Sequence, residues 1–200
     1  MKKKIWDIYA PLYERFMRSD EKAYRRMYER IPEVIRGKTV LEIATGPGLI
    51  AKHVAPAAKR MIATDYAEGM IREAKKGVCP ENLSFAVADA TALPYEDDSF
   101  DVVIIANALH VMPDPEQALS EIDRVLKPDG VLIAPNFVHS EPRPGARMLA
   151  QLIKIAGIRF EAKWTAKEYI GFLEQHGFRV VHSETLAARI TMLYTECVRR

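Results

Sequence analysis

The sequence predicts an α/β protein with a doubly wound, mostly parallel sheet of seven strands, the last two of which form an antiparallel pair. Short apolar runs, rich in β-branched residues and nearly continuous, are typical of strands buried on both faces. Helical patterns fill the gaps between these runs, and such alternation implies right-handed crossovers between parallel strands. The runs lie at residues 39–44, 60–64, 83–88, 101–106 and 131–135, with helical patterns at 49–55, 68–76 and 115–126.

Local signals mark where several of these elements begin and end. Asp114 stands directly before a proline, which predicts an N-cap followed by proline at the first helical position. The sequence Lys-Pro-Asp-Gly at 127–130 predicts the end of that helix and a turn into the next strand. A His-Gly pair predicts the end of a helix over 165–176. Residues 178–198 hold two further strand patterns, which most simply pair antiparallel and close the sheet.

Two segments are predicted to cap this core. Residues 1–36 have helical apolar spacing and are expected to form a helical lid on the main domain, residues 37–200. Within that domain, residues 136–165 join a loop to an apolar, basic helical pattern and are expected to be a cap insertion. The apolar stripe of the lid consists of Ile5, Trp6, Ile8, Tyr9, Leu12, Tyr13, Phe16 and Met17. Such a stripe is most often core, but beside Lys2–Lys4 it is also compatible with peripheral contact to an anionic membrane.

The composition excludes several classes of protein. The chain of 200 residues carries 29 Lys and Arg against 27 Asp and Glu, a net charge of +2, which argues against a nucleic-acid binder. A hydrophobic content of 48% excludes a disordered chain. The two cysteines lie far apart and the five histidines lack ligand spacing, so neither a disulfide nor a metal site is expected. No apolar run approaches the ~18 residues of a membrane span, and we expect a soluble, cytoplasmic protein.

Three acidic residues fall where successive predicted strands end. Glu42, Asp65 and Asp89 are 23 and 24 residues apart, and Glu42 leads into a glycine turn. In an open parallel sheet, ligands bind at the carboxyl ends of the strands, so these three side chains are expected to surround one site. A single acid at a strand exit is as readily a helix cap, but three in register favour a binding function.

The acids also indicate which ligand the site takes. Gly46 and Gly48, followed by Ala51, match the dinucleotide fingerprint, but Glu42 beneath the turn would oppose a pyrophosphate and suit an ammonium group. Asp65 can accept two ribose hydroxyls. Asp89 can accept an amino proton from adenine, with the Ala90 N–H beside it. An adenosine with a cationic amino-acid tail satisfies all three acids, and that ligand is S-adenosylmethionine (SAM).

Several stretches resemble the class I SAM-dependent methyltransferases, which have a Rossmann-like fold. VLEIATGPG resembles the first motif of the family, and TDYAEGMIREAKK the acid that follows its second strand. VADATALPYEDDSFDVVI and ALHVMPDPEQALSEIDRVLKPDGVLI resemble its third to fifth strands. The resemblance covers about residues 38–135 and is to the small-molecule group of ubiquinone and menaquinone biosynthesis. The YAPLY segment at 9–13 resembles the N-terminal segment of that group, whose tyrosine helps to close the cofactor pocket.

The resemblance implies SAM as cofactor, S-adenosylhomocysteine (SAH) as product and no metal. The implied cofactor contacts are Tyr13, Glu42, Ala44, Thr45, Gly46, Gly48, Asp65, Tyr66, Met70, Asp89, Ala90 and Asn107. Ala44 stands where the family has its first glycine. An alanine is tolerated there if its φ stays negative, although its methyl group crowds the approach to the methionyl tail.

His110 is the candidate general base, because it leaves the fourth strand just after Asn107, where the acceptor is expected. The alternative is a histidine that only packs at the start of a helix. The function expected is methyl transfer to a small organic acceptor in a pocket built by residues 1–20 and 136–165. The alternatives are a lipid- or quinone-directed methyltransferase at the membrane surface, a NAD-dependent oxidoreductase, and a non-catalytic SAM-binding module. The acceptor and the oligomeric state are left open.

Overall fold

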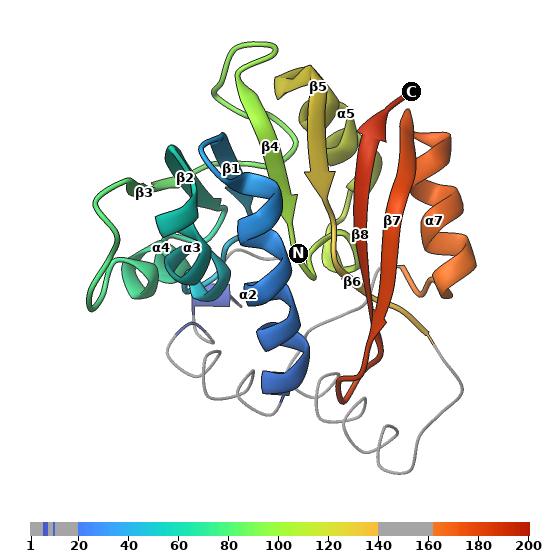
Figure 1. Ribbon diagram of the computed structural model, residues 1–200, viewed down its shortest axis with the longest axis horizontal. Helices are drawn as coiled ribbons and strands as arrows, with labels where there is room; N and C mark the ends of the chain where they lie inside the picture. The colour runs from blue at the N-terminus through green and yellow to red at the C-terminus, as the bar shows by residue number, and fades with distance from the viewer. Residues whose placement is uncertain (1–5, 8–9, 11–19, 140–161) are drawn as a thin grey trace.

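A mixed sheet of eight strands forms the centre of the protein in the computed structural model, which describes residues 6–7, 10, 20–139 and 162–200 (Figure 1). The strand order is β3-β2-β1-β4-β5-β8-β6, and β7 pairs with β8. The strands are β1 (Thr39–Ile43), β2 (Arg60–Asp65), β3 (Leu83–Val87), β4 (Phe100–Ile105), β5 (Leu126–Ile133), β6 (Asn136–Phe137), β7 (Phe178–Leu186) and β8 (Met192–Arg199). Strand order reverses between β1 and β4, which is where open α/β sheets bind ligands.

The strand directions confirm the predicted doubly wound, mostly parallel sheet. Strands β1 to β5 pair in parallel, whereas β8 runs antiparallel to β5, β6 and β7. The strand beyond the seven predicted is β6, in which Asn136 pairs with Leu193 and Phe137 with Met192. Two residues are too few to show any periodicity, so this strand depends on the partner that β8 presents to it.

Helices cover both faces of the sheet, α2 and α3 one face and α5 and α7 the other (Figure 1). They are α2 (Glu21–Ile35), α3 (Leu49–Val54), α4 (Glu68–Ala74), α5 (Pro115–Val125) and α7 (Ala166–Gln175), with short 3₁₀ turns η2 (Ala55–Ala57) and η3 (Leu109–Val111). In β4, Val102 and Ile104 join the core beneath α2, while Val103 and Ile105 join the core beneath α5. Burial of both faces explains why this strand reads as an unbroken apolar run.

The predicted starts and ends of these helices are confirmed, with one difference at residues 127–130. The Asp114 carboxylate accepts a hydrogen bond of 3.0 Å from the Gln117 N–H and caps α5, and Gly177 ends α7 with a φ of +89°. Helix α5 stops at the predicted place, but β5 begins there at once. The pairing with β4 jumps from Leu126 to Val131, so residues 127–130 bulge out of the ladder instead of forming a separate turn.

The two predicted capping segments lie partly outside the described residues. Helix α2 accounts for residues 21–35 of the predicted lid, and Trp6, Asp7 and Ala10 are helical, but residues 1–5, 8–9 and 11–19 are not described. Most of the predicted cap insertion, residues 140–161, is not described either, so the division into lid, core and cap stays a prediction. Within the described ranges no helix is both long and apolar enough to cross a bilayer.

Candidate functional site

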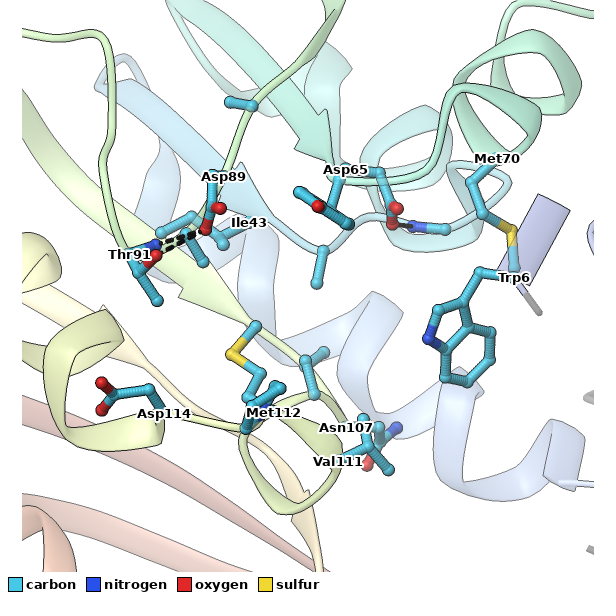
Figure 2. A pocket seen from close by; sticks show the side chains of 18 residues that line it. Trp6, Ile43, Asp65, Met70, Asp89, Thr91, Asn107, Val111, Met112 and Asp114 are labelled. Carbon is cyan, nitrogen blue, oxygen red and sulfur yellow. Dashed lines mark hydrogen bonds between the residues drawn. The ribbon is translucent and has the colours of Figure 1, made fainter. Parts of the chain in front are cut away.

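A cavity of about 410 Å³ lies at the carboxyl ends of β1, β2 and β4 (Figure 2). This volume falls within the usual range for small-molecule sites. Eight of the predicted cofactor residues line it: Ala44, Gly46, Asp65, Tyr66, Met70, Asp89, Ala90 and Asn107. Glu42, Thr45, Gly48 and His110 do not line it, and Tyr13 lies outside the described residues.

The turn between β1 and α3 brings the backbone to the edge of this cavity. Ala44, Gly46 and Gly48 all have left-handed backbone angles, with φ of +56°, +58° and +79°. A Cβ atom at Gly48 would also lie 3.0 Å from the Phe85 ring, so two independent constraints select glycine there. The condition under which an alanine is tolerated here, a negative φ, is therefore not met at Ala44. The turn holds this alanine in a left-handed conformation, which brings its Cβ too close to the following carbonyl oxygen.

Replacing Ala44 with glycine is expected to raise the free energy of unfolding by about 1 kcal/mol, because glycine adopts a positive φ without steric cost. Denaturation in urea measures the change. Ala106→Gly is the matched control, since this residue also lines the cavity but is not among those with positive φ. There the substitution is expected to destabilise the fold. A loss of stability in both variants would contradict the strain that we assign to Ala44.

Asp65 and Asp89 reach the cavity, and each is held by hydrogen bonds. One Asp65 oxygen accepts from the Gly46 N–H at 2.8 Å (Figure 2), and the other accepts from the Ala67 N–H at 2.9 Å. Asp65 therefore ties the glycine turn to the start of α4. Asp89 Oδ1 accepts from the backbone N–H of Thr91 at 2.9 Å and from its hydroxyl at 2.7 Å. Both carboxylates thus lie in fixed positions on one wall of the cavity.

Glu42 lies behind the turn instead of in the cavity. Its carboxyl group is buried and accepts a hydrogen bond of 2.8 Å from the Thr45 hydroxyl. Burial raises the pKa of Glu42 to about 8, against the opposing effect of the Thr45 hydrogen bond. Burial likewise raises the pKa of Asp65. A cationic ligand nearby would favour the ionised form of both groups and lower their pKa values, whereas a phosphate would raise them further.

Asn107 is the cavity residue whose side chain most directly indicates a bound ligand. It follows β4 with a φ of +53°, and its backbone N–H donates to the Pro135 carbonyl at 2.7 Å. Both polar atoms of its side-chain amide are buried without a hydrogen-bond partner. An unpaired buried polar atom costs about 1–3 kcal/mol, and strained, unsatisfied residues cluster at functional sites. The amide can offer both N–H donors of its nitrogen and its acceptor oxygen to a ligand.

His110 packs beside the cavity instead of facing into it. Its side chain is 3% exposed, and its Nδ1 lies 2.8 Å from Asn136 Oδ1. The ring meets Phe137 edge-on, with the ring centroids 5.4 Å apart. Burial lowers the pKa of His110 to about 4, so the imidazole is neutral at pH 7. These contacts favour the packing interpretation of this residue over the general-base interpretation.

Several residues of the cavity were not among the predicted cofactor contacts. Val111, Met112 and Pro113 line it from η3 and the loop after it, within a stretch that resembles the family but in which no contact was predicted for these residues. Trp6 lines it from the N-terminal segment, and the apolar stripe is the signal that marked this residue. Together with Met70 these residues give the cavity much of its apolar lining.

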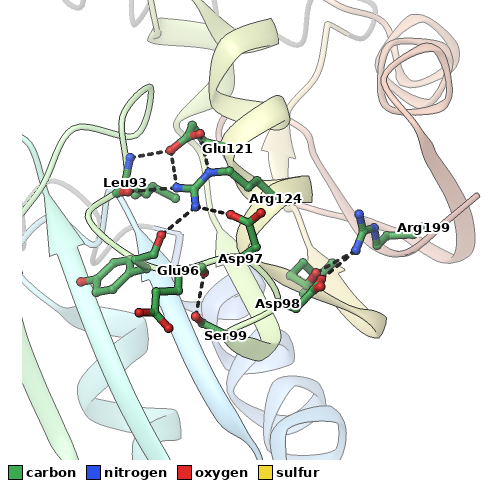
Figure 3. Close-up of polar contacts among 10 residues, drawn as sticks. Leu93, Glu96, Asp97, Asp98, Ser99, Glu121, Arg124 and Arg199 are labelled. Atoms are coloured by element: carbon green, nitrogen blue, oxygen red, sulfur yellow. Dashed lines mark hydrogen bonds and ion pairs between the residues drawn. The ribbon is translucent and has the colours of Figure 1, made fainter.

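Arg124 of α5 anchors the loop that carries Asp89 (Figure 3). Its guanidinium donates to the carbonyls of Leu93 at 3.0 Å and Tyr95 at 2.7 Å, and it pairs with Glu121. Glu121 in turn accepts from the Leu93 N–H at 2.7 Å. The ion pair with Arg124 lowers the pKa of Glu121, so the carboxylate stays charged at neutral pH. The far end of the loop is thus held to the core by charge-assisted hydrogen bonds.

Comparison with known proteins links this cavity to one chemistry. The model of a methyltransferase domain matches residues 41–134, which include most of the cavity wall. Demethylmenaquinone methyltransferase of Renibacterium salmoninarum is 32% identical over 139 residues, covering 68% of this chain and 58% of that protein. Demethylmenaquinone methyltransferase of Clavibacter sepedonicus is 28% identical, covering 88% of this chain and 79% of that protein. The chain thus spans less than two thirds of the first of these relatives.

Solved structures agree on the fold. The methyltransferase in complex with the Haloferax volcanii Trm112 activator superposes with a TM-score of 0.83, covering 98% of this chain and 96% of that one, at 22% identity. The DhpI–SAH complex superposes with a TM-score of 0.77, covering 98% and 94%, also at 22% identity. At identities this low the likeness extends to the architecture alone.

Proposed function

Since the chain belongs to the class I SAM-dependent methyltransferases, in the group similar to the enzymes of ubiquinone and menaquinone biosynthesis, we propose that it transfers a methyl group from SAM to a small organic acceptor. The observation that carries the proposal is the cavity itself. Among the described residues, its lining combines the hydrogen-bonded carboxylates of Asp65 and Asp89 with an unpaired buried amide and includes no lysine or arginine.

The polar groups of the cavity are compatible with SAM, a nucleoside with a cationic sulfonium tail. In the proposed complex Asp65 would accept the ribose hydroxyls, and Asp89 with the Ala90 N–H would meet the adenine edge. The left-handed turn at Gly46 and the Asn107 amide would hold the polar groups of the methionyl tail. A pyrophosphate would instead meet the carboxylate of Asp65 at the glycine turn, an unfavourable pairing that argues against a dinucleotide.

The residues of this chain contribute mainly orientation and exclusion of water. When bound, the sulfonium group of SAM supplies an activated methyl group and a good leaving group, so the reaction needs no protein acid. The walls formed by Trp6, Met70, Val111 and Met112 exclude water from that region, and fixed polar groups hold the reactants in line. Orientation of this kind supplies about 7–11 kcal/mol of the barrier reduction. A base is required only for an acceptor that carries a proton on the reacting atom.

The general-base hypothesis for His110 has a direct test. We expect His110→Gln to change the rate at saturating SAM by less than about threefold, because the ring is buried, its lowered pKa makes it a weak base, and it lies outside the cavity lining. Radiolabelled methyl transfer across pH 5–9 measures it, with circular dichroism as the check on folding. A loss of about 10²–10⁴-fold that follows the titration of one group would instead make His110 the base.

Calorimetric titration with SAM, SAH and NAD tests the proposed function most directly. The proposal expects SAM and SAH to bind and NAD not to bind. A labelled-methyl screen against thiols, phenols, amines, quinones and lipid headgroups then identifies the acceptor. NAD binding would favour the oxidoreductase alternative. Binding of SAM without turnover on any acceptor would favour a non-catalytic binding module.

A quinone or lipid acceptor at the membrane surface is the second candidate, favoured because both curated relatives reported above act on demethylmenaquinone by name. The apolar wall at Val111 and Met112 suits an aromatic ring as well as it suits any small apolar group. Sedimentation with anionic liposomes at low and high salt separates the two candidates. An absence of binding at low salt would eliminate the membrane-directed version.

A further inference from the structure

The N-terminal segment touches α4 at a glycine, and the contact is unusually close. The Asp7 carboxylate accepts a hydrogen bond of 2.6 Å from the Gly69 N–H, between residues 62 apart in the chain. A Cβ atom at position 69 would lie 2.8 Å from the Asp7 Cα atom and 2.6 Å from its carboxylate oxygen. Because one of these neighbours is backbone, a side chain at Gly69 would displace the whole segment and not just one rotamer.

Apolar contacts extend this attachment toward the cavity. Ala10, which is 3% exposed, packs against Ala67 and Met70, and Trp6 packs against the same cluster. Trp6 and Met70 both line the cavity, and Figure 2 shows the indole on the side of Met70. Helix α4 therefore carries one cavity residue itself and receives a second from the N-terminal segment.

We propose that Asp7 is a positioning residue, which fastens the N-terminal segment to α4 and thereby places the Trp6 indole on the wall of the cofactor cavity. This inference rests on the proposed function, because it gives Trp6 a role in holding the cofactor. An aromatic face beside a sulfonium or thioether contributes favourable contact, and its loss is expected to weaken binding about five- to tenfold.

The variant Gly69→Ala distinguishes the positioning of Trp6 by Asp7 from a general contribution to the stability of the fold. Alanine in place of glycine favours the helical conformation, so α4 itself is expected to become no less stable. The same methyl group pushes Asp7 away, so the segment and Trp6 are expected to move. Gly171→Ala is the matched control, since Gly171 lies in α7 and a Cβ atom there meets nothing within 4 Å.

A single-tryptophan protein reports the position of Trp6 without any ligand. The chain has two tryptophans, Trp6 and Trp164, so Trp164→Phe leaves Trp6 as the sole indole. In this background, Gly69→Ala and Asp7→Ala are expected to raise the acrylamide quenching constant about twofold. Asp7→Asn retains an oxygen acceptor for the Gly69 N–H and is expected to behave like the parent, as is Gly171→Ala.

Titration of the same variants with SAM and SAH completes the test. We expect the dissociation constants to rise about five- to tenfold for Gly69→Ala and Asp7→Ala. The urea midpoint is expected to change little for Gly69→Ala, because the helix propensity of alanine offsets the lost hydrogen bond, and to fall for Asp7→Ala, because the Gly69 N–H loses its acceptor. Equal quenching and equal affinity in Gly69→Ala, in a parent that binds both ligands, would overturn this inference alone. A parent that binds neither ligand would overturn the proposed function and with it the cofactor role of Trp6, whatever the quenching shows.

Discussion

Substitution of Asp65 with alanine is expected to weaken SAH binding by about 100-fold and to lower the free energy of unfolding by about 2 kcal/mol. The affinity falls because two charge-assisted hydrogen bonds to the ribose hydroxyls would be lost, each worth about 1.5 kcal/mol or more. Stability falls because the N–H groups of Gly46 and Ala67 lose their acceptor, and the glycine turn is no longer tied to the start of α4.

Calorimetry with SAH and urea denaturation measure the two effects of Asp65→Ala separately. Asp129→Ala is the matched control, because it removes one exposed carboxylate from the 127–130 bulge, outside the cavity lining. This control is expected to leave both quantities within experimental error. Retained SAH affinity in Asp65→Ala, alongside the expected loss of stability, would show that Asp65 is only a structural link and that another group holds the ribose.

Glu42→Gln is expected to stabilise the unliganded protein strongly at alkaline pH and hardly at all in acid. The pKa of Glu42 is raised from 4.5 to about 8, so the folded state keeps a proton that the unfolded state releases. The wild-type protein therefore loses stability as the pH rises from about 4.5 to about 8, by an amount on the order of 5 kcal/mol. Glutamine cannot ionise, yet its side-chain oxygen can still accept the Thr45 hydrogen bond.

Urea denaturation at pH 4.5, 7 and 9 measures this difference between wild type and Glu42→Gln. Glu196→Gln provides a control of opposite sign. Burial opposes the ionisation of Glu196, but hydrogen bonds from Arg30 and Tyr194 outweigh it and lower its pKa. Glu196→Gln is expected to lower the free energy of unfolding at neutral pH and to lower it less in acid. If the free energies of unfolding of wild type and Glu42→Gln differed by the same amount at every pH, the raised pKa of Glu42 would be contradicted.

Most of the fold was predictable because its determinants are local in the chain. The apolar run of β4 is continuous because alternate residues enter opposite cores, and this pattern is visible without knowing the partners of the strand. Asp114 before a proline marks the start of α5 in the same way, through a hydrogen bond to a residue three positions on. Asp65 and Asp89 were identifiable because each follows directly from a strand whose end is itself predictable.

The remainder of the site depends on contacts between distant residues. A left-handed φ at Ala44 contradicts the preference of alanine, and only the closure of the β1–α3 turn imposes it. His110 is at a strand exit in the sequence, yet Asn136 and Phe137 bury it away from the cavity. The eighth strand, β6, exists because β8 offers it a partner.

The sequence by itself determined the order of strands and helices, the side of the sheet that binds a ligand, and the acidic character of the cavity. Periodicity, caps and strand exits are properties of neighbouring residues, which a single chain displays directly. The tertiary structure alone decided that Glu42 is buried behind the turn, that the Asn107 amide lacks a partner, and that Asp7 meets Gly69 across 62 positions. These outcomes depend on which distant groups pack together, and the energies involved arise only when the whole chain has closed around them.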